Sequence, residues 1–314
     1  MFFRTFVLVM SSLADRVRQT LKSSDTEGKF ELYVTRTPGY LWALMFRTLG
    51  VHPIAVTLMS IALGAASGWC FLYDDARHTL LGIFLLIWAN WYDCADGQLA
   101  RMTGKKTLVG RVLDGFAGDV WFFSIYFFIC LRLTPEWGFW IWALGAWAGL
   151  HCHTRQCAIA DYYRNIHLFF VLGGQKAELD DSRRLRTEYE GLRWRSADWF
   201  RKLYLLFYTR YTEGQERQTP EFQKLKTAIG KVYGDGMPPD GLRSRFRQDS
   251  LPLMPSTNIL TFDTRIAVLF ASLLAGAPWV YFVFESTGLE WLRLRTVKRH
   301  EAICRKYCLE ISAT

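Results

Sequence analysis

Four aspartates lie within 27 residues of largely apolar sequence: Asp93, Asp96, Asp114 and Asp119. A carboxylate inside a membrane costs about 2.5–3.5 kcal/mol on insertion scales, so its presence there points to a function. Several carboxylates that face one another repel unless cations lie between them. Because clustered carboxylate oxygens are hard ligands, they favour Mg²⁺ or Mn²⁺ over zinc. Such a site suits a substrate with a diphosphate, whose oxygens complete the coordination of the metal.

The spacing predicts that three of these aspartates meet. Asp93 and Asp96 are three residues apart, so they share one face of a helix. The following apolar stretch runs antiparallel to that helix, which returns Asp114 to the same depth.

The residues between the aspartates are small or basic. Gly97 and Ala100 leave space for a bulky group to lie against the helix backbone. Arg101 offers a planar guanidinium to phosphate oxygens. Gly110 faces these residues from the next helix, four positions before Asp114. This arrangement predicts a nucleotide or other phosphate-bearing group beside the metal.

In chain order these residues form the string Asp93-x2-Asp96-Gly97-x2-Ala100-Arg101-x8-Gly110-x3-Asp114. The string resembles the signature of the CDP-alcohol phosphatidyltransferase family, D-x2-D-G-x2-A-R-x8-G-x3-D-x3-D, at every position except the last. The resemblance covers roughly residues 30–170 and the last two spans. It implies a phospholipid-biosynthetic transferase that moves a substituted phosphate from a CDP-linked lipid or CDP-alcohol to an alcohol acceptor and releases CMP. It also implies two bound Mg²⁺ or Mn²⁺ ions, contact with membrane lipid and a homodimer.

The last aspartate of the signature falls on Gly118, and the nearest carboxylate is Asp119. The resemblance makes this aspartate a fourth metal ligand and the catalytic base, with Asp114 as the alternative base. A displacement of one residue turns the side chain by about 100° on a regular helix. We therefore expect a π-turn between Gly115 and Gly118 that redirects Asp119 toward Asp114.

Weaker similarities lie outside the signature. Pro53 to Thr57 resembles a segment that enters the first span in family members, and Thr57 is expected at the CDP moiety. Asp161 to Arg164 imperfectly matches the branch that transfers to inositol phosphate. On this basis Arg164 and Arg265 are predicted to bind an anionic acceptor, although arginines at a membrane surface also extend to headgroups without a specific ligand.

The elements that position these residues are predicted to be membrane-spanning helices. Of the 314 residues 51% are hydrophobic, and residues 54–73 contain no charge over a length of about 30 Å as a helix. This excludes a wholly soluble enzyme. The fold class is an all-α polytopic membrane bundle of about six helices, predicted at 54–73, 78–99, 110–132, 138–165, 264–278 and, less regularly, 281–300.

Charge divides the chain further. The net charge of +9 falls on the 101–111 loop, on a polar segment and on the tail, as expected for loops on the cytoplasmic side. Both termini and the active site are therefore predicted to be cytoplasmic, with no nucleic acid as partner. The predicted parts are an interfacial segment 1–50, spans one to four in 51–172, a polar insertion 173–263, two spans in 264–300 and a basic tail 301–314.

Two other functions use intramembrane aspartates. A Mg²⁺-dependent prenyltransferase also holds a lipid diphosphate, but it needs more spans and two well-separated aspartate motifs. A cation channel or transporter uses acidic rings, yet the chain lacks paired broken helices. Among the cysteines, Cys304 and Cys308 in the tail are interpreted as buried or unmodified thiols rather than lipidation sites.

Overall fold

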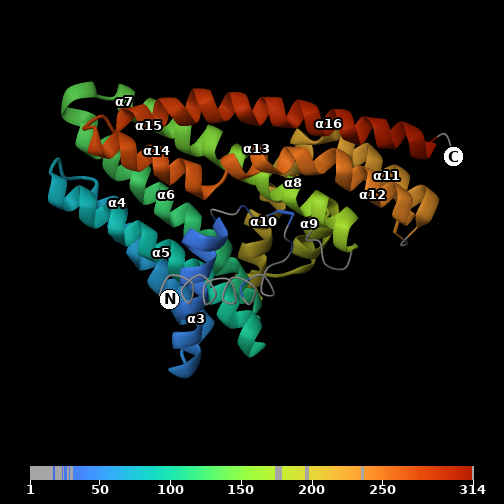
Figure 1. The fold of residues 1–314 in the computed structure, drawn as a ribbon, viewed down its shortest axis with the longest axis horizontal. Coiled ribbons are helices and arrows are strands. Elements are labelled where there is room, and N and C mark those ends of the chain that lie inside the picture. The colour runs from blue at the N-terminus through green and yellow to red at the C-terminus, as the bar shows by residue number, and fades with distance from the viewer. Residues whose placement is uncertain are drawn as a thin grey trace, which may run out of the picture. The chain divides into compact units, whose positions relative to one another are not determined.

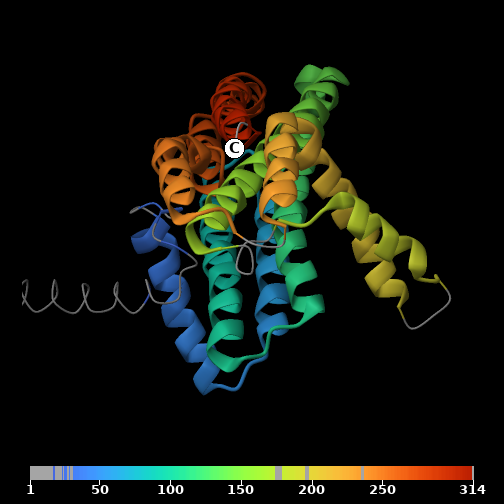
Figure 2. The same cartoon turned by 90° about the vertical axis from the view of Figure 1, so that its right-hand side faces the viewer.

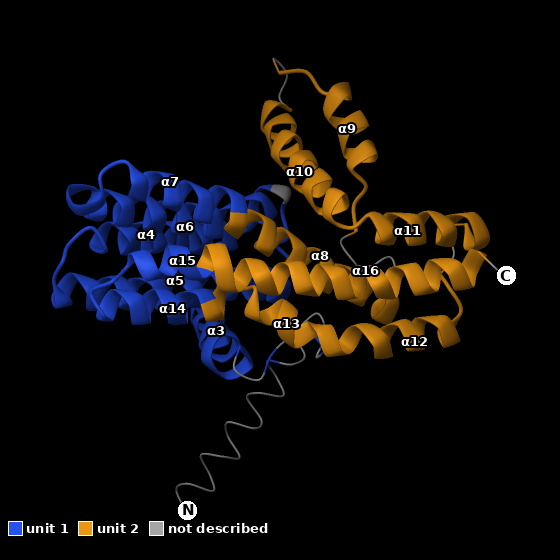
Figure 3. Ribbon diagram, turned by 90° about the horizontal axis from the view of Figure 1, so that it is seen from above, with its two compact units in different colours: residues 1–151, 265–284 blue, residues 152–264, 285–314 orange. Residues whose placement is uncertain are grey.

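The computed structural model describes residues 31–173, 179–194, 198–234 and 237–312, with five isolated positions before Glu31. Every regular element in these ranges is helical, which confirms the predicted all-α class. Two compact units are present (Figure 3), made of residues 1–151 with 265–284 and of residues 152–264 with 285–314. Most of the predicted interfacial segment before Glu31 lies outside the described residues.

Four helices form the centre of unit 1: α3 (Thr37–Thr48), α4 (Pro53–Cys70), α5 (Ala76–Thr103) and α6 (Leu108–Trp137). Helix α4 packs against both α5 and α6, and α3 packs against α5 (Figures 1 and 2). The same unit holds α7 (Trp140–Ala146), α15 (Trp279–Phe284) and most of α14 (Phe262–Leu274).

The ends of these helices follow from capping residues. The Asp75 side chain accepts hydrogen bonds from two backbone N–H groups at the start of α5, and the Thr107 side chain accepts one at the start of α6. Helix α5 ends at Gly104, whose φ of 68° lies in the left-handed region that glycine adopts without strain. Residues 104–107 are therefore enough to start a new helix beside the end of α5.

Helices α4 and α6 approach closely because α4 carries small residues at the contact. A Cβ atom added to Gly64 would lie 2.0 Å from the Trp121 ring, and one added to Gly68 would lie 2.4 Å from Ser124 Oγ. The Trp121 indole donates a hydrogen bond of 3.1 Å to the Ser60 carbonyl, and Ser124 Oγ donates one of 2.8 Å to a carbonyl of α4. Small residues and hydrogen bonds of this kind hold helices together where lipid removes the hydrophobic drive.

A buried apolar cluster fixes α3 and α4 against the polar end of α5. Its members come from all three helices: Ala43, Phe46, Val56, Ala95 and Leu99. Ala95 lies between the two aspartates of α5 and Leu99 lies three residues after Asp96, so this packing sets the rotation of α5 about its axis.

Unit 2 contains the polar insertion together with α8 and the C-terminal helix. Its helices are α8 (Thr154–Leu172), α9 (Ser182–Gly191), α10 (Trp199–Gln218), α11 (Pro220–Tyr233), α12 (Asp240–Ser250), α13 (Met254–Ile259) and α16 (Glu290–Ser312). Among the described residues, four short segments, which are distributed over both units, are 3₁₀ or π helices: η1 (Leu32–Arg36), η2 (Trp147–His153), η3 (Leu251–Leu253) and η4 (Glu285–Leu289). Helix α16 packs against α11, and α8 packs against α10 and α12.

Three described helical stretches are long and apolar enough to cross a membrane: Pro53–Cys70, Val109–Trp137 and Asp240–Leu274. They coincide with or contain most of the first, third and fifth predicted spans. Helix α5 is not among them, because polar residues near both of its ends lower its hydropathy. The predicted fourth and sixth spans are divided by η2 and η4. Six spans therefore stay a prediction, within a helical bundle of membrane type.

Candidate active site

Asp93, Asp96 and Asp114 converge in unit 1. One carboxylate oxygen of each lies within 4.8 Å of the other two. Helix α5 supplies Asp93 and Asp96 from its last three turns, and α6 supplies Asp114 from its second turn. This convergence agrees with the one predicted from the spacing of the three aspartates in the sequence.

Asp96 is the buried member of the group. It is 3% exposed, and its Oδ2 atom has no hydrogen-bond partner among the described residues. The Thr57 side chain of α4 lies near the same carboxyl group, and its hydroxyl donates a hydrogen bond of 3.2 Å to the Pro53 carbonyl. Asp93 is half-buried and Asp114 is exposed, so the group opens on one side.

The residues present fit a divalent cation. A buried carboxylate oxygen without a partner, close to two further carboxylates, is costly unless a positive charge compensates it. Three carboxylates without nitrogen or sulfur ligands form a hard donor set, which Mg²⁺ and Mn²⁺ prefer. Asp93, Asp96 and Asp114 are therefore the candidate metal ligands.

Arg101 lies over Gly97 on the surface of α5. A Cβ atom added to Gly97 would lie 3.5 Å from Arg101 Nη1 and 3.8 Å from Nη2, which is ordinary van der Waals contact. Gly97 and Ala100 are half-buried, and Arg101 is exposed. The glycine thus leaves an accessible surface between a guanidinium and the aspartates, as expected for a phosphate-binding position.

Gly110 has a structural reason that the sequence did not reveal. Its N–H donates a hydrogen bond of 3.0 Å to Thr107 Oγ1, the cap of α6, and an added Cβ atom would lie 3.0 Å from that oxygen. The same Cβ atom would lie 3.7 Å from Ile54 of α4. The contact with α4 would be an ordinary one, so the cap oxygen sets the tighter limit on a side chain here. The predicted contact of Gly110 with the nucleotide stays a prediction.

Arg36 is a charged neighbour that sequence reasoning placed only in the interfacial segment. Its guanidinium interacts electrostatically with Asp93, and it is ion-paired with Glu31 at 3.0 Å. The Gln98 side chain of α5 donates a hydrogen bond of 3.2 Å to the Arg36 carbonyl. No spacing rule connects residues 57 positions apart in sequence, so only the packing of η1 on α5 brings Arg36 to Asp93.

Residues 50–167 match the family model described as CDP-alcohol phosphatidyltransferase. The chain carries a CDP-alcohol phosphatidyltransferase domain. The matched range contains α4, α5 and α6, and with them all three converging carboxylates. The family transfers a phosphate-linked group from a CDP-alcohol and generally depends on a divalent metal. A search of curated proteins finds no match to this chain.

The CDP-alcohol phosphatidyltransferase domain has no π-turn after Asp114, so that prediction is wrong. Helix α6 is α-helical throughout Leu108–Trp137. Gly115 and Gly118 would permit a bulge, and a Cβ atom added to either would meet no described atom within 4 Å, but the helix stays regular there. Asp119 is exposed and, five positions after Asp114, points about 140° away from it around the helix. The group within 4.8 Å accordingly contains three aspartates and not Asp119.

The two predicted acceptor arginines differ in environment. Arg164 of α8 is half-buried, and its Nε and Nη2 atoms donate hydrogen bonds of 3.2 and 2.7 Å to Asn258 Oδ1. Arg265 of α14 has no exposed surface. An acceptor can therefore reach Arg265 only inside the protein, whereas Arg164 is partly accessible.

Proposed function

We propose that the protein transfers a substituted phosphate from a CDP-linked lipid, or another CDP-alcohol, to an alcohol acceptor and releases CMP. The observation that carries this proposal is the convergence of Asp93, Asp96 and Asp114 inside the family-matched segment. Gly97 and Arg101 support it, because together they provide an open surface and a guanidinium beside the carboxylates.

The chemistry follows from the positions of these groups. Divalent ions held by Asp93, Asp96 and Asp114 would neutralise the donor diphosphate and draw charge from its β-phosphorus. Arg101 binds phosphate oxygens and orients the diphosphate along α5. The acceptor hydroxyl attacks the β-phosphorus, the bond from that phosphorus to the CMP oxygen breaks, and its electron pair leaves with CMP. The hydroxyl proton passes to a carboxylate, for which the exposed Asp114 is the candidate base.

In this proposal the site opens toward the cytoplasm. Arg101, Lys105, Lys106 and Arg111 are all exposed around the connection between α5 and α6. Basic residues beside spans are retained on the cytoplasmic side, where they also meet anionic headgroups.

Enlarging Gly97 is expected to weaken donor binding in steps. Gly97→Ala adds a Cβ atom at ordinary contact distance from Arg101, so the KM for the donor should change less than about threefold. Gly97→Leu fills the surface and displaces Arg101, which costs about 1–3 kcal/mol, or roughly 5- to 150-fold in KM. Steady-state kinetics with a CDP-linked lipid measure both variants. An unchanged Tm shows that each variant folds, and normal CDP binding by Gly97→Leu would place the nucleotide elsewhere.

For the acceptor, the proposal favours an anionic polyol such as inositol phosphate over glycerol phosphate, serine or choline. Arg164 supports it as a partly accessible guanidinium held in place by Asn258. CMP release measured with each acceptor in parallel, and mass spectrometry of lipids in a host that lacks the product, test this. Preference for an uncharged or cationic alcohol would remove the acceptor role of Arg164 and Arg265, and no CMP release with any acceptor would contradict the function itself.

A further inference from the structure

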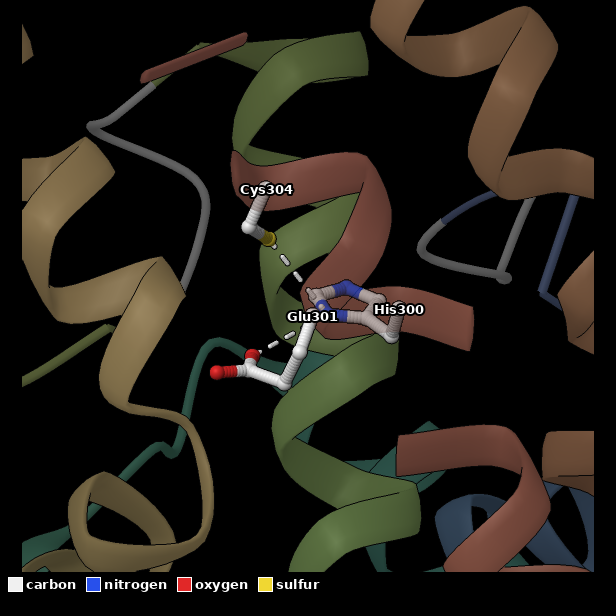
Figure 4. A group of neighbouring side chains, drawn as sticks. All are labelled: His300, Glu301 and Cys304. Atoms are coloured by element: carbon white, nitrogen blue, oxygen red, sulfur yellow. Dashed lines mark hydrogen bonds and ion pairs between the residues drawn. The ribbon is translucent and has the colours of Figure 1, made fainter. Parts of the chain in front are cut away.

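A second group of potential metal ligands lies on α16 in unit 2 (Figure 4). His300, Glu301 and Cys304 each turn one donor atom toward the others, and the three donor atoms lie within 4.8 Å of one another. His300 is 1% exposed and Cys304 is fully buried, and the Glu301 side chain is 12% exposed. All three residues lie outside the segment that matches the transferase family.

The distances agree with those in a zinc site. His300 Nδ1 lies 3.5 Å from Cys304 Sγ and 3.9 Å from Glu301 Oε1. Zinc binds imidazole nitrogen and carboxylate oxygen at about 2.0–2.2 Å and thiolate sulfur at about 2.3 Å, in tetrahedral geometry. These bond lengths separate nitrogen from sulfur by about 3.5 Å and nitrogen from oxygen by about 3.4 Å. The first pair already has the required spacing, and the second needs to close by only about 0.5 Å.

Two contacts from other helices orient these ligands. Glu301 Oε2 accepts a hydrogen bond of 2.6 Å from the Glu221 backbone N–H, at the start of α11. The Tyr163 ring of α8 stacks on the His300 ring, with centroids 3.8 Å apart and an interplanar angle of 12°. Contacts between metal ligands and residues outside the coordination shell orient the ligands in many protein metal sites.

Two buried oxygens in this region lack hydrogen-bond partners among the described residues. One is Glu301 Oε1, the carboxylate oxygen that faces His300. The other is the Tyr163 hydroxyl, whose side chain is fully buried and interacts electrostatically with Glu301 and Cys304. Leaving two oxygens unpaired costs free energy that a bound cation would recover.

We propose that His300, Glu301 and Cys304 bind one zinc ion, with a water molecule in the fourth position. Nitrogen, sulfur and oxygen donors together suit this borderline-soft ion, whereas Mg²⁺ does not take a thiolate. Cys304 binds as the thiolate, and its proton is released to solvent. The ion joins α16 to α11 through Glu301, so its role is structural and independent of the proposed function.

Cobalt provides a direct test on the purified full-length chain in detergent. Excess Mg²⁺ is present so that hard carboxylate sites are filled. Wild-type protein is expected to bind one Co²⁺ per chain and to show the near-ultraviolet charge-transfer band of a cobalt–thiolate bond. Zinc should displace the cobalt stoichiometrically and raise the Tm.

Two cysteines one turn apart supply the matched controls. Cys304→Ser should lose the charge-transfer band, whereas Cys308→Ser should keep it, because Cys308 lies outside the group. Glu301→Gln should keep the band but weaken Co²⁺ binding at least about tenfold. Absence of the band in wild-type protein, its persistence in Cys304→Ser or its loss in Cys308→Ser would overturn the proposal and leave an intrahelical thiol–imidazole hydrogen bond.

Discussion

Replacing Asp96 by asparagine is expected to lower transferase activity by at least about 100-fold, since even residues that only orient metal ligands cost 10–100-fold when removed. Asparagine keeps the shape of the buried side chain but removes its charge and places an amide among carboxylates. In wild-type protein, EDTA should abolish CMP release, and Mg²⁺ or Mn²⁺ should restore it. The activity of Asp96→Asn should not recover at the Mg²⁺ concentration that saturates the wild type.

Stability separates a metal ligand from a merely structural aspartate. Without a divalent ion the three carboxylates repel, so in EDTA the Asp96→Asn variant should have a higher Tm than the wild type. With Mg²⁺ the wild type should have the higher Tm, because only the wild type gains the full binding free energy of the ion. Glu136→Gln is an exposed change at the far end of α6. Its Tm in EDTA and in Mg²⁺ and its activity should all equal those of the wild type. Full activity of Asp96→Asn would remove the metal assignment.

The convergence of the carboxylates was predictable because it depends on local rules. Asp93 and Asp96 share a helix face whatever surrounds them. A glycine C-cap at Gly104 and a threonine N-cap at Thr107 then start the next helix within four residues, which returns Asp114 to the same end. Periodicity and capping are encoded over short windows, so the sequence specifies this part of the site without knowledge of the tertiary fold.

The rest of the site depends on packing that no local window contains. Helix α4 packs against both α5 and α6 and so brings Thr57 to Asp96. The docking of η1 on α5 brings Arg36 to Asp93. In the fold, the π segments form at residues 32–36, 147–153 and 285–289 rather than at the glycines after Asp114. Glycines make a bulge inexpensive, but tertiary contacts decide where one forms.

The positions of residues 118 and 119 around α6 lead to the last prediction, which is that Gly118→Asp increases activity. Position 118 is about 40° from Asp114 around the helix, whereas Asp119 is about 140° away. A Cβ atom at Gly118 would meet no described atom within 4 Å, and aspartate is no worse than glycine in a helix. A carboxylate there would stand beside the metal ligands as a dedicated base. Since a positioned base contributes about 10²–10⁴-fold, we expect kcat to rise at least about tenfold, without change in donor KM.

The matched control is Gly115→Asp, which adds the same charge to the same helix, with the same open space, one position after Asp114. At about 100° from Asp114 it should leave kcat unchanged. Asp119→Asn should change kcat by less than about threefold, because the side chain points away from the reacting atoms. If Asp119→Asn instead abolishes turnover with donor binding intact, and Gly118→Asp restores it in the double variant, Asp119 is the base and α6 must rearrange to present it. If Asp119→Asn and Gly118→Asp both leave kcat unchanged, proton transfer to Asp114 alone sustains the reaction, and the fourth carboxylate of the family signature has no counterpart in this chain.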